Sequence, residues 1–115
     1  MISKAHRFAG SRSLRFVYQN GTTARGPIFS IKAAPNPRQK SYRAAVVVSR
    51  KVHKSAVARN RMRRRLYEII RSLESDIDRP FDIVLTVFSE SLLDEPPQSL
   101  ARQVKKQLLA AGVLK

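Results

Sequence analysis

The stretch of sequence that decides the fold is residues 42–73, which read YRAAVVVSRKVHKSAVARNRMRRRLYEIIRSL. It opens with an apolar run, residues 42–49, that is typical of a strand covered on both faces. Ser55 is then a suitable N-cap, and apolar residues recur at helical spacing as far as about Glu74. These apolar positions are Met62, Leu66, Ile69, Ile70 and Leu73. The stretch therefore predicts a buried strand followed by an amphipathic helix.

Two further elements are predicted after this helix. A turn at residues 76–80 leads into a second apolar strand at residues 81–88. Residues 94–97 then open a last helix, because proline is favoured at the first helical positions, and Gly112 closes it. The apolar stripe of this helix consists of Leu100, Val104, Leu108 and Ala111.

Two elements are predicted before the stretch. Ser13 is a candidate N-cap of a short helix that Gly21 ends, and Ile28 begins a strand that runs toward Ala34. Residues 34–40 contain two prolines and are interpreted as a hairpin loop between that strand and the next one. The order α-β-β-α-β-α predicts an α+β fold for residues 1–115. The chain is expected to be a single domain, with one sheet of three or four strands and helices packed on it.

The charge of the chain is divided unevenly along its 115 residues, which carry a formal net charge of +15. Residues 1–67 hold 17 Lys and Arg and no acid, whereas residues 68–115 hold all 8 acids and 6 Lys and Arg. A small domain with such a field requires a polyanionic partner, either a nucleic acid or an anionic membrane. The contact surface is therefore expected in the first part of the chain.

The composition excludes several classes of protein. The absence of cysteine removes disulfides, zinc fingers and thiol nucleophiles. The longest apolar stretches, residues 44–48 and 83–87, are too short to span a bilayer, and no apolar segment follows Met1. The chain is therefore expected to be a cytoplasmic protein that is not inserted in a membrane.

The predicted helix after Ser55 is unusually basic at its start. Cations in the opening turns oppose the helix dipole, at a cost of about 0.3–1 kcal/mol. Arg61 and Arg65 are like charges at i, i+4, which costs about 0.2–0.5 kcal/mol more. A surface that served solubility alone would mix both signs, so this face is interpreted as a nucleic-acid contact. Arg59 differs from the others because it lies at the edge of the apolar stripe, where a groove between helix and sheet is expected.

The acids offer no catalytic centre of their own. A protein nuclease needs clustered carboxylates for two metal ions, or a histidine with a positioned partner. All eight acids lie apart from the basic residues in the sequence, and His6 and His53 each lack such a partner. The acids weighed for this role are Asp76, Asp78, Asp82, Asp94 and Glu95. The chain is therefore expected to contain no catalytic residue and no metal site.

The basic residues also carry a family signature. The matching positions are Ser49-Arg50-Lys51-Val52, Lys54, Ala56-Val57, Arg59-Asn60-Arg61, Arg64 and Arg65. Together they resemble the Arg-Asn-Arg signature of the protein subunit of bacterial ribonuclease P, and the similarity extends along nearly the whole chain. The resemblance implies four strands and three main helices, related to one domain of a ribosomal protein. It also implies a left-handed crossover through the motif helix, although general sterics favour the right-handed form.

The same resemblance implies the function. In that family a catalytic RNA removes the 5′ leader from precursor tRNA with magnesium ions, while the protein binds the RNA and the leader. The implied partners are therefore the ribonuclease P RNA and the precursor tRNA leader, with magnesium held mainly by RNA and no cofactor bound by the protein alone. The residues implied to bind RNA are Arg7, Arg50, Lys51, Lys54, Arg59, Asn60, Arg61, Arg64 and Arg65.

The resemblance further implies a leader cleft between the first helix and the sheet. The candidates for this cleft are Leu14, Tyr18, Phe29 and Lys32. Leu14 replaces a usual phenylalanine, and base stacking on an aromatic ring contributes about 1–3 kcal/mol per base. Leader binding is therefore expected to depend more on charge here. For Phe16 and Phe29, a place in the core is an equally good interpretation.

Three other functions are compatible with the charge. A ribosomal or other structural RNA-binding protein would use a similar fold. A DNA-binding module would need a helix-turn-helix pattern or a dimer seam, and the sequence shows neither. Binding to an anionic membrane would need the apolar face of the motif helix, which the sheet requires.

Overall fold

The computed structural model describes residues 11–77 and 79–114, and within them the chain forms three helices and four strands. In chain order these are α1 (Ser11–Asn20), β1 (Thr22–Arg25), β2 (Phe29–Pro35), β3 (Arg43–Val47), α2 (Ala56–Ser72), β4 (Phe81–Val87) and α3 (Pro97–Ala110). Two short 3-10 turns, η2 (Glu74–Asp76) and η3 (Glu90–Leu93), lie before and after β4.

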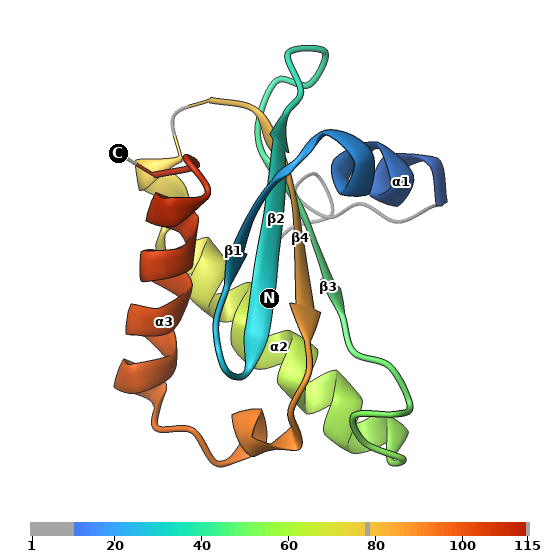
Figure 1. Cartoon of the computed structure of the whole chain (residues 1–115). Coiled ribbons are helices and arrows are strands. Elements are labelled where there is room, and N and C mark those ends of the chain that lie inside the picture. The colour runs from blue at the N-terminus through green and yellow to red at the C-terminus, as the bar shows by residue number, and fades with distance from the viewer. Residues whose placement is uncertain (1–10, 78, 115) are drawn as a thin grey trace.

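The four strands form one mixed sheet in the order β1-β2-β4-β3 (Figure 1). β2 pairs antiparallel with β1 and with β4, whereas β3 pairs parallel with β4. Every residue of β4 except Thr86 is buried. The continuous apolar run at this position is therefore that of a central strand with both faces covered.

β1 is the strand that the residue pattern did not predict. Only Ala24 in it is buried, so the strand offers no alternating apolar signal. It is an edge strand, held to β2 by main-chain pairing from Thr22 opposite Ala33 to Arg25 opposite Ser30. With β1 the sheet has the four strands that the family resemblance implied.

The interpretation of residues 34–40 as a hairpin loop is wrong. β2 and β3 are not neighbours, because β4 lies between them. The segment instead crosses the start of β4, where the Asn36 N–H donates to the carbonyl of Pro80 at 2.9 Å. The prolines do end β2, but they do not determine which strand pairs with it.

The connection from β3 through α2 to β4 is a left-handed crossover. In Figure 1 both strands point downward, α2 lies behind the sheet, and the chain steps leftward from β3 to β4. A right-handed crossover with its helix on this face would step in the opposite direction. The hand that the family resemblance implied is thereby confirmed.

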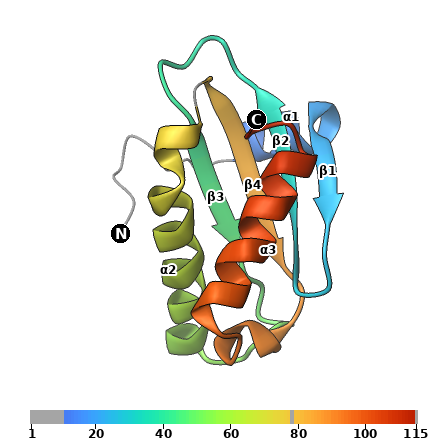
Figure 2. The same cartoon turned by 90° about the vertical axis from the view of Figure 1, so that its left-hand side faces the viewer.

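The helices divide between the two faces of the sheet, and each face has its own apolar cluster. α2 and α3 lie side by side over one face, with α1 beyond the sheet (Figure 2). The larger cluster, under α2 and α3, includes the fully buried side chains of Phe29, Ile31, Met62, Leu66, Ile70, Leu85, Leu100 and Leu108. The smaller cluster, under α1, consists of Val17, Ala45 and Val84, with Leu14 and Val47 packed against it. On this second face Ser30, Lys32 and Thr86 stay half-buried.

A buried ion pair fixes the start of β3 against β4. The Arg43 guanidinium donates to both carboxylate oxygens of Asp82, at 2.9 and 2.8 Å. The side-chain amide of Asn36 donates to the same carboxylate at 2.7 Å. Asp82 is only 1% exposed, so its charge is fully engaged in holding the strands and the crossing loop together.

Candidate nucleic-acid interface

The loop between β3 and α2 is held in a fixed shape by its own polar groups. Ser55 is the N-cap of α2, and its hydroxyl accepts a hydrogen bond from the Ala58 N–H at 3.2 Å, as predicted. The Ser55 N–H in turn donates to Nδ1 of His53 at 3.0 Å. These two hydrogen bonds hold the loop against the first turn of α2.

Arg59 closes this loop onto the helix. One nitrogen of its guanidinium, Nη1, donates to the carbonyls of His53 and Lys54, both at 2.9 Å. Because Arg59 lies at the edge of the apolar stripe, its side chain reaches the loop and holds it against α2. The other guanidinium N–H groups form no hydrogen bond with the residues that the structure describes, so they remain available to a ligand.

From its position in the helix, Arg65 was expected on the solvent-facing side of α2, but the structure does not place it there. It is half-buried, and its guanidinium donates to the main-chain carbonyls of Leu92, Leu93 and Glu95. These three bonds tie the segment after β4 to α2. The Nη1 and Nη2 groups of Arg65 are thus engaged by the protein's own backbone, and its contact with RNA stays a prediction.

The remaining motif residues form an exposed polar surface without internal partners. Their side chains make no ion pair or hydrogen bond with any residue in the described part of the chain. This surface, called here the motif surface, consists of Arg50, Lys51, Lys54, Asn60, Arg61 and Arg64. Five unpaired cations on one loop and one helix suit the spaced phosphates of a polynucleotide.

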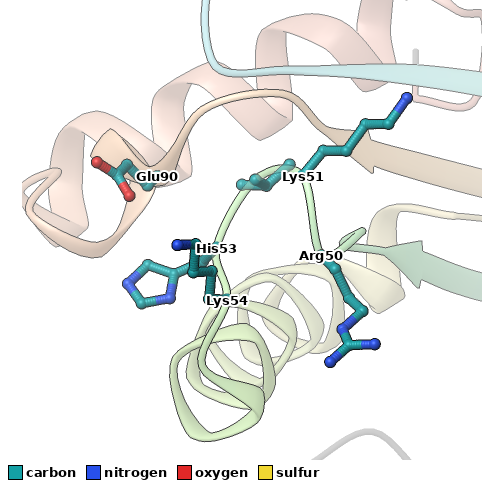
Figure 3. Close-up of a pocket in the computed structure, with 6 residues that line it drawn as sticks. Arg50, Lys51, His53, Lys54 and Glu90 are labelled. Carbon is teal, nitrogen blue, oxygen red and sulfur yellow. The ribbon is translucent and has the colours of Figure 1, made fainter.

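An open hollow of about 450 Å³ lies at the loop end of the motif surface. The hollow is lined by residues 50–54 and by Glu90, and Figure 3 shows Glu90 across from Lys51 and His53. A neighbouring hollow of about 520 Å³ shares His53 and Glu90 and adds Asp94. The tertiary structure thus brings two acids to the basic loop, although the sequence places all acids apart from it.

The second candidate surface lies on the face of the sheet that carries α1. Tyr18 and Phe16 are 46% and 41% exposed, while Leu14 packs against the small apolar cluster under the helix. Lys32 lies on the same face and is half-buried. Residues 16 and 18 lie about 160° apart around α1, so the two exposed rings flank the helix on either side of the buried Val17, and Phe16 lies outside the core.

Phe29 does not belong to this surface. Its side chain is 0% exposed and lies in the cluster under α2 and α3, on the opposite face of the sheet from Lys32. The reason is the alternation of a β-strand, which points residues 29 and 32 to opposite faces. Phe29 is therefore a core residue, and its assignment to the leader cleft is wrong. Arg7 lies outside the described residues.

The acids do not assemble into a metal site in the described part of the chain. No group of three or more His, Cys, Asp or Glu side chains there lies close enough to hold an ion. No helix in that part is both long and apolar enough to cross a membrane.

Comparison with known proteins decides the family. Residues 2–112 match the family model described as Ribonuclease P. The chain belongs to the ribonuclease P protein family. The Ribonuclease P protein component of Chloroflexus aurantiacus is 33% identical over 113 residues, which cover 98% of this chain and 82% of that protein. The corresponding component of a Pseudanabaena species is 34% identical over 115 residues, covering 99% and 97% of the two chains.

Solved structures of the ribonuclease P family share the fold. The RNase P protein of Staphylococcus aureus matches with a TM-score of 0.84 at 22% identity, covering 97% of this chain and all of that one. The protein of Thermotoga maritima, in complex with 1-(4-fluorophenyl)-2-thiourea, matches with a TM-score of 0.75 at 24% identity, covering 84% and 92%.

Membership of the ribonuclease P family confirms the function that the signature implied. The chain is the RNA-binding protein subunit of the ribonucleoprotein endonuclease that processes the 5′ end of tRNA, and it partners the ribonuclease P RNA. The alternatives of a ribosomal protein, a DNA-binding module and a membrane-binding protein are set aside by this match.

Proposed function

We propose that the motif surface binds phosphates of the ribonuclease P RNA and of the precursor tRNA leader, while the RNA carries out phosphodiester hydrolysis. The observation that carries this proposal is the set of exposed cations on the β3–α2 loop and on α2 that have no partner in the described protein. Magnesium ions are held mainly by the RNA in this arrangement, because the described acids are dispersed or engaged. The setting is the cytoplasm, where bacterial precursor tRNA is made.

The leader runs from the loop onto the face of the sheet that carries α1. Tyr18 and Phe16 offer stacking surfaces there, and Lys32 offers a charge beside them. Leu14 is packed inward, so this face provides fewer stacking contacts and more electrostatic attraction. Leader affinity is accordingly expected to be sensitive to salt and tolerant of leader sequence.

Cleavage of precursor tRNA at low magnesium tests this proposal. The protein is added to a bacterial ribonuclease P RNA, and the rate of 5′ cleavage is measured for the unmodified chain and for an Arg61→Ala, Arg64→Ala double variant. The double variant is expected to lose at least about tenfold in RNA affinity, since each phosphate contact contributes to binding. Arg102→Ala, which removes an exposed charge on α3, is the matched control. Equal stimulation by both variants would exclude the motif surface as the binding site.

The leader contact is tested separately with precursor tRNAs of different leader length. Tyr18→Ala is expected to reduce the advantage of a long leader over a one-nucleotide leader, with little effect on binding of the ribonuclease P RNA. A Tyr18→Ala protein that keeps the full advantage of the long leader would place the leader elsewhere.

A further inference from the structure

A separate hollow of about 230 Å³ lies between the turn that joins β1 to β2 and the C-terminal half of α3. Residues that line it include Arg25, Gly26, Gln103, Lys106, Gln107 and Ala110. None of these residues belongs to the motif surface. The Arg25 side chain points to the face that carries α1, because Arg25 pairs with Ser30 and alternates with the buried Ala24. The hollow, called here the α3 hollow, has no role in the function proposed above.

Two glutamines that line the α3 hollow each have a side-chain oxygen with no hydrogen-bond donor among the described residues. Gln107 is 6% exposed, and its amide nitrogen donates to the Phe29 carbonyl at 3.0 Å, but its Oε1 is buried without a partner. Gln103 donates to Glu95 at 3.1 Å and to Ser99 at 3.3 Å, and its Oε1 is likewise buried and unpartnered. A buried acceptor without a donor costs about 1–3 kcal/mol, and native proteins seldom leave one unsatisfied.

The turn at Gly26 is shaped around one of these amides. A Cβ atom at position 26 would lie 2.4 Å from the amide nitrogen of Gln107, so any larger residue would push that side chain away. The Gly26 N–H donates at 3.0 Å to the Phe29 carbonyl, the same oxygen that accepts from Gln107. Backbone and side chain thus fix the Gln107 amide at the wall of the hollow.

The rim of the α3 hollow is positively charged. Lys106 lines the hollow, is exposed and makes no ion pair with the described residues. α3 contains Arg102, Lys105 and Lys106 and no acid. An anionic group at the rim would therefore meet an attractive field with no competing carboxylate on the helix.

We propose that the α3 hollow binds one unpaired nucleotide of RNA, with the base inside and the phosphate at Lys106. Its volume is below the range of about 300–1,000 Å³ that is usual for drug-sized ligands, and it suits a single base. The base must supply N–H donors to the two unpartnered oxygens, and guanine offers N1–H and the N2 amino group on one edge. The half-buried Gln103 side chain turns toward the base to admit it, since its own bonds run along α3 to residues near the helix start.

Titration of the full chain with mononucleotides, followed by NMR of its ¹⁵N-labelled amides, tests this proposal. GMP is expected to shift the signals of the Gln107 side-chain amide and of the Gly26 backbone amide in a saturable way. UMP is expected to bind at least about fivefold more weakly, because its base has a single N–H donor, and inorganic phosphate is expected to leave the Gln107 signal unshifted.

Two neighbouring lysines of α3 provide a matched pair of variants. Lys106→Ala removes a lining charge and is expected to weaken GMP binding about fivefold, whereas Lys105→Ala, also exposed but outside the hollow, is expected to leave it unchanged. Equal binding of GMP and phosphate, or equal effects of the two variants, would overturn the proposal. Arg61→Ala is expected to retain GMP binding at the hollow, so this result is independent of the motif surface.

A photo-crosslinking group at Ala110, tested in the assembled ribonucleoprotein, determines whether the nucleotide belongs to RNA. The expected product is a crosslink to an unpaired guanosine of the ribonuclease P RNA or of the precursor tRNA. If GMP binds the free protein but no crosslink to either RNA forms, the assignment to RNA is refuted.

Discussion

Arg65→Ala is expected to destabilise the fold and to leave the electrostatic binding of RNA nearly intact. The Arg65 guanidinium donates to three carbonyls of residues 92–95, among them Glu95 at 2.6 Å and Leu93 at a weaker 3.4 Å. A hydrogen bond to a charged group contributes about 1.5–3 kcal/mol. The bonds to Leu92 and Glu95 are the two strong ones, and their contribution is reduced because water can reach part of this half-buried site. The expected loss in the free energy of unfolding is therefore about 2–4 kcal/mol.

Urea denaturation followed by far-ultraviolet circular dichroism measures this loss, at a fixed sulfate concentration that offsets the repulsion of the +15 chain. The Arg65→Ala midpoint is expected to fall by about 1–2 M. Arg61→Ala is the control, because Arg61 is exposed and bonds to no described residue, and its effect is expected to stay within about 0.5 kcal/mol. Arg65→Lys keeps the charge but not the planar array of donors, so an intermediate loss is expected.

Equal midpoints for Arg65→Ala and Arg61→Ala would refute this reasoning. So would a reduction in the salt dependence of RNA binding that is as large for Arg65→Ala as for Arg61→Ala, because that result would show a free phosphate contact at Arg65.

The other predictions concern charge and protonation. A plot of log K for RNA binding against log salt concentration is expected to have a slope of about −3 to −5, and Arg61→Ala should reduce its magnitude by about one; a slope near zero would contradict the electrostatic account. Asp82→Asn is expected to lower the free energy of unfolding by about 2–4 kcal/mol in urea titrations, because its arginine partner loses a buried counter-charge; an unchanged midpoint would show that the pair adds nothing. Burial and the hydrogen bond to Glu74 raise the pKa of Tyr42, so the folded state keeps a proton that the unfolded chain loses. The contribution of Tyr42 to the free energy of unfolding is therefore complete below about pH 10 and decreases as the pH rises further. Tyr42→Phe should make this alkaline decrease smaller, as measured by urea midpoints at pH 9 and pH 11.

Several helix ends were predictable because they depend on local chemistry, but the prediction that Ser13 caps the first helix is wrong, since α1 begins at Ser11. Ser55 was predicted to cap a helix ending near Glu74, and α2 spans Ala56–Ser72 with Ser55 as its cap. The glycine that closes α3, Gly112, has a φ of 83°, which a residue with a side chain rarely adopts. Such signals act within one turn of the chain, so a single sequence contains them in full.

Strand pairing was less predictable because it joins residues far apart in the chain. Residues 34–40 carry a correct signal for the end of β2, yet no local feature shows that β4 enters between β2 and β3. β1 escaped prediction because an edge strand with one buried residue has almost no pattern to detect. The left-handed crossover was expected only from the family resemblance, since general sterics favour the other hand.

The candidate site was likewise predictable only where it depends on local features of the chain. The positions of the motif residues on α2 follow from helical periodicity, and the exposure of Arg61 and Arg64 agrees with it. Periodicity does not reveal what faces a side chain, and Arg65 in fact meets backbone carbonyls of residues 92–95. Glu90 joins the basic loop for the same reason, because the loops after β3 and β4 leave the same edge of a parallel pair.

The sequence by itself determined that this protein has a strongly basic helix for binding, now seen as α2, and at which residue that helix begins. It also indicated the family to which the chain belongs. The features of the helix rest on charge, capping and periodicity, which are properties of neighbouring residues, and the family rests on the resemblance of the Arg-Asn-Arg signature. Only the tertiary structure decided which arginines are free for RNA, which aromatic rings are exposed, and that two glutamines with unpartnered oxygens line a hollow beside α3. These depend on what each side chain meets across the fold, and such contacts form only when the parallel strands and their crossover bring distant segments together.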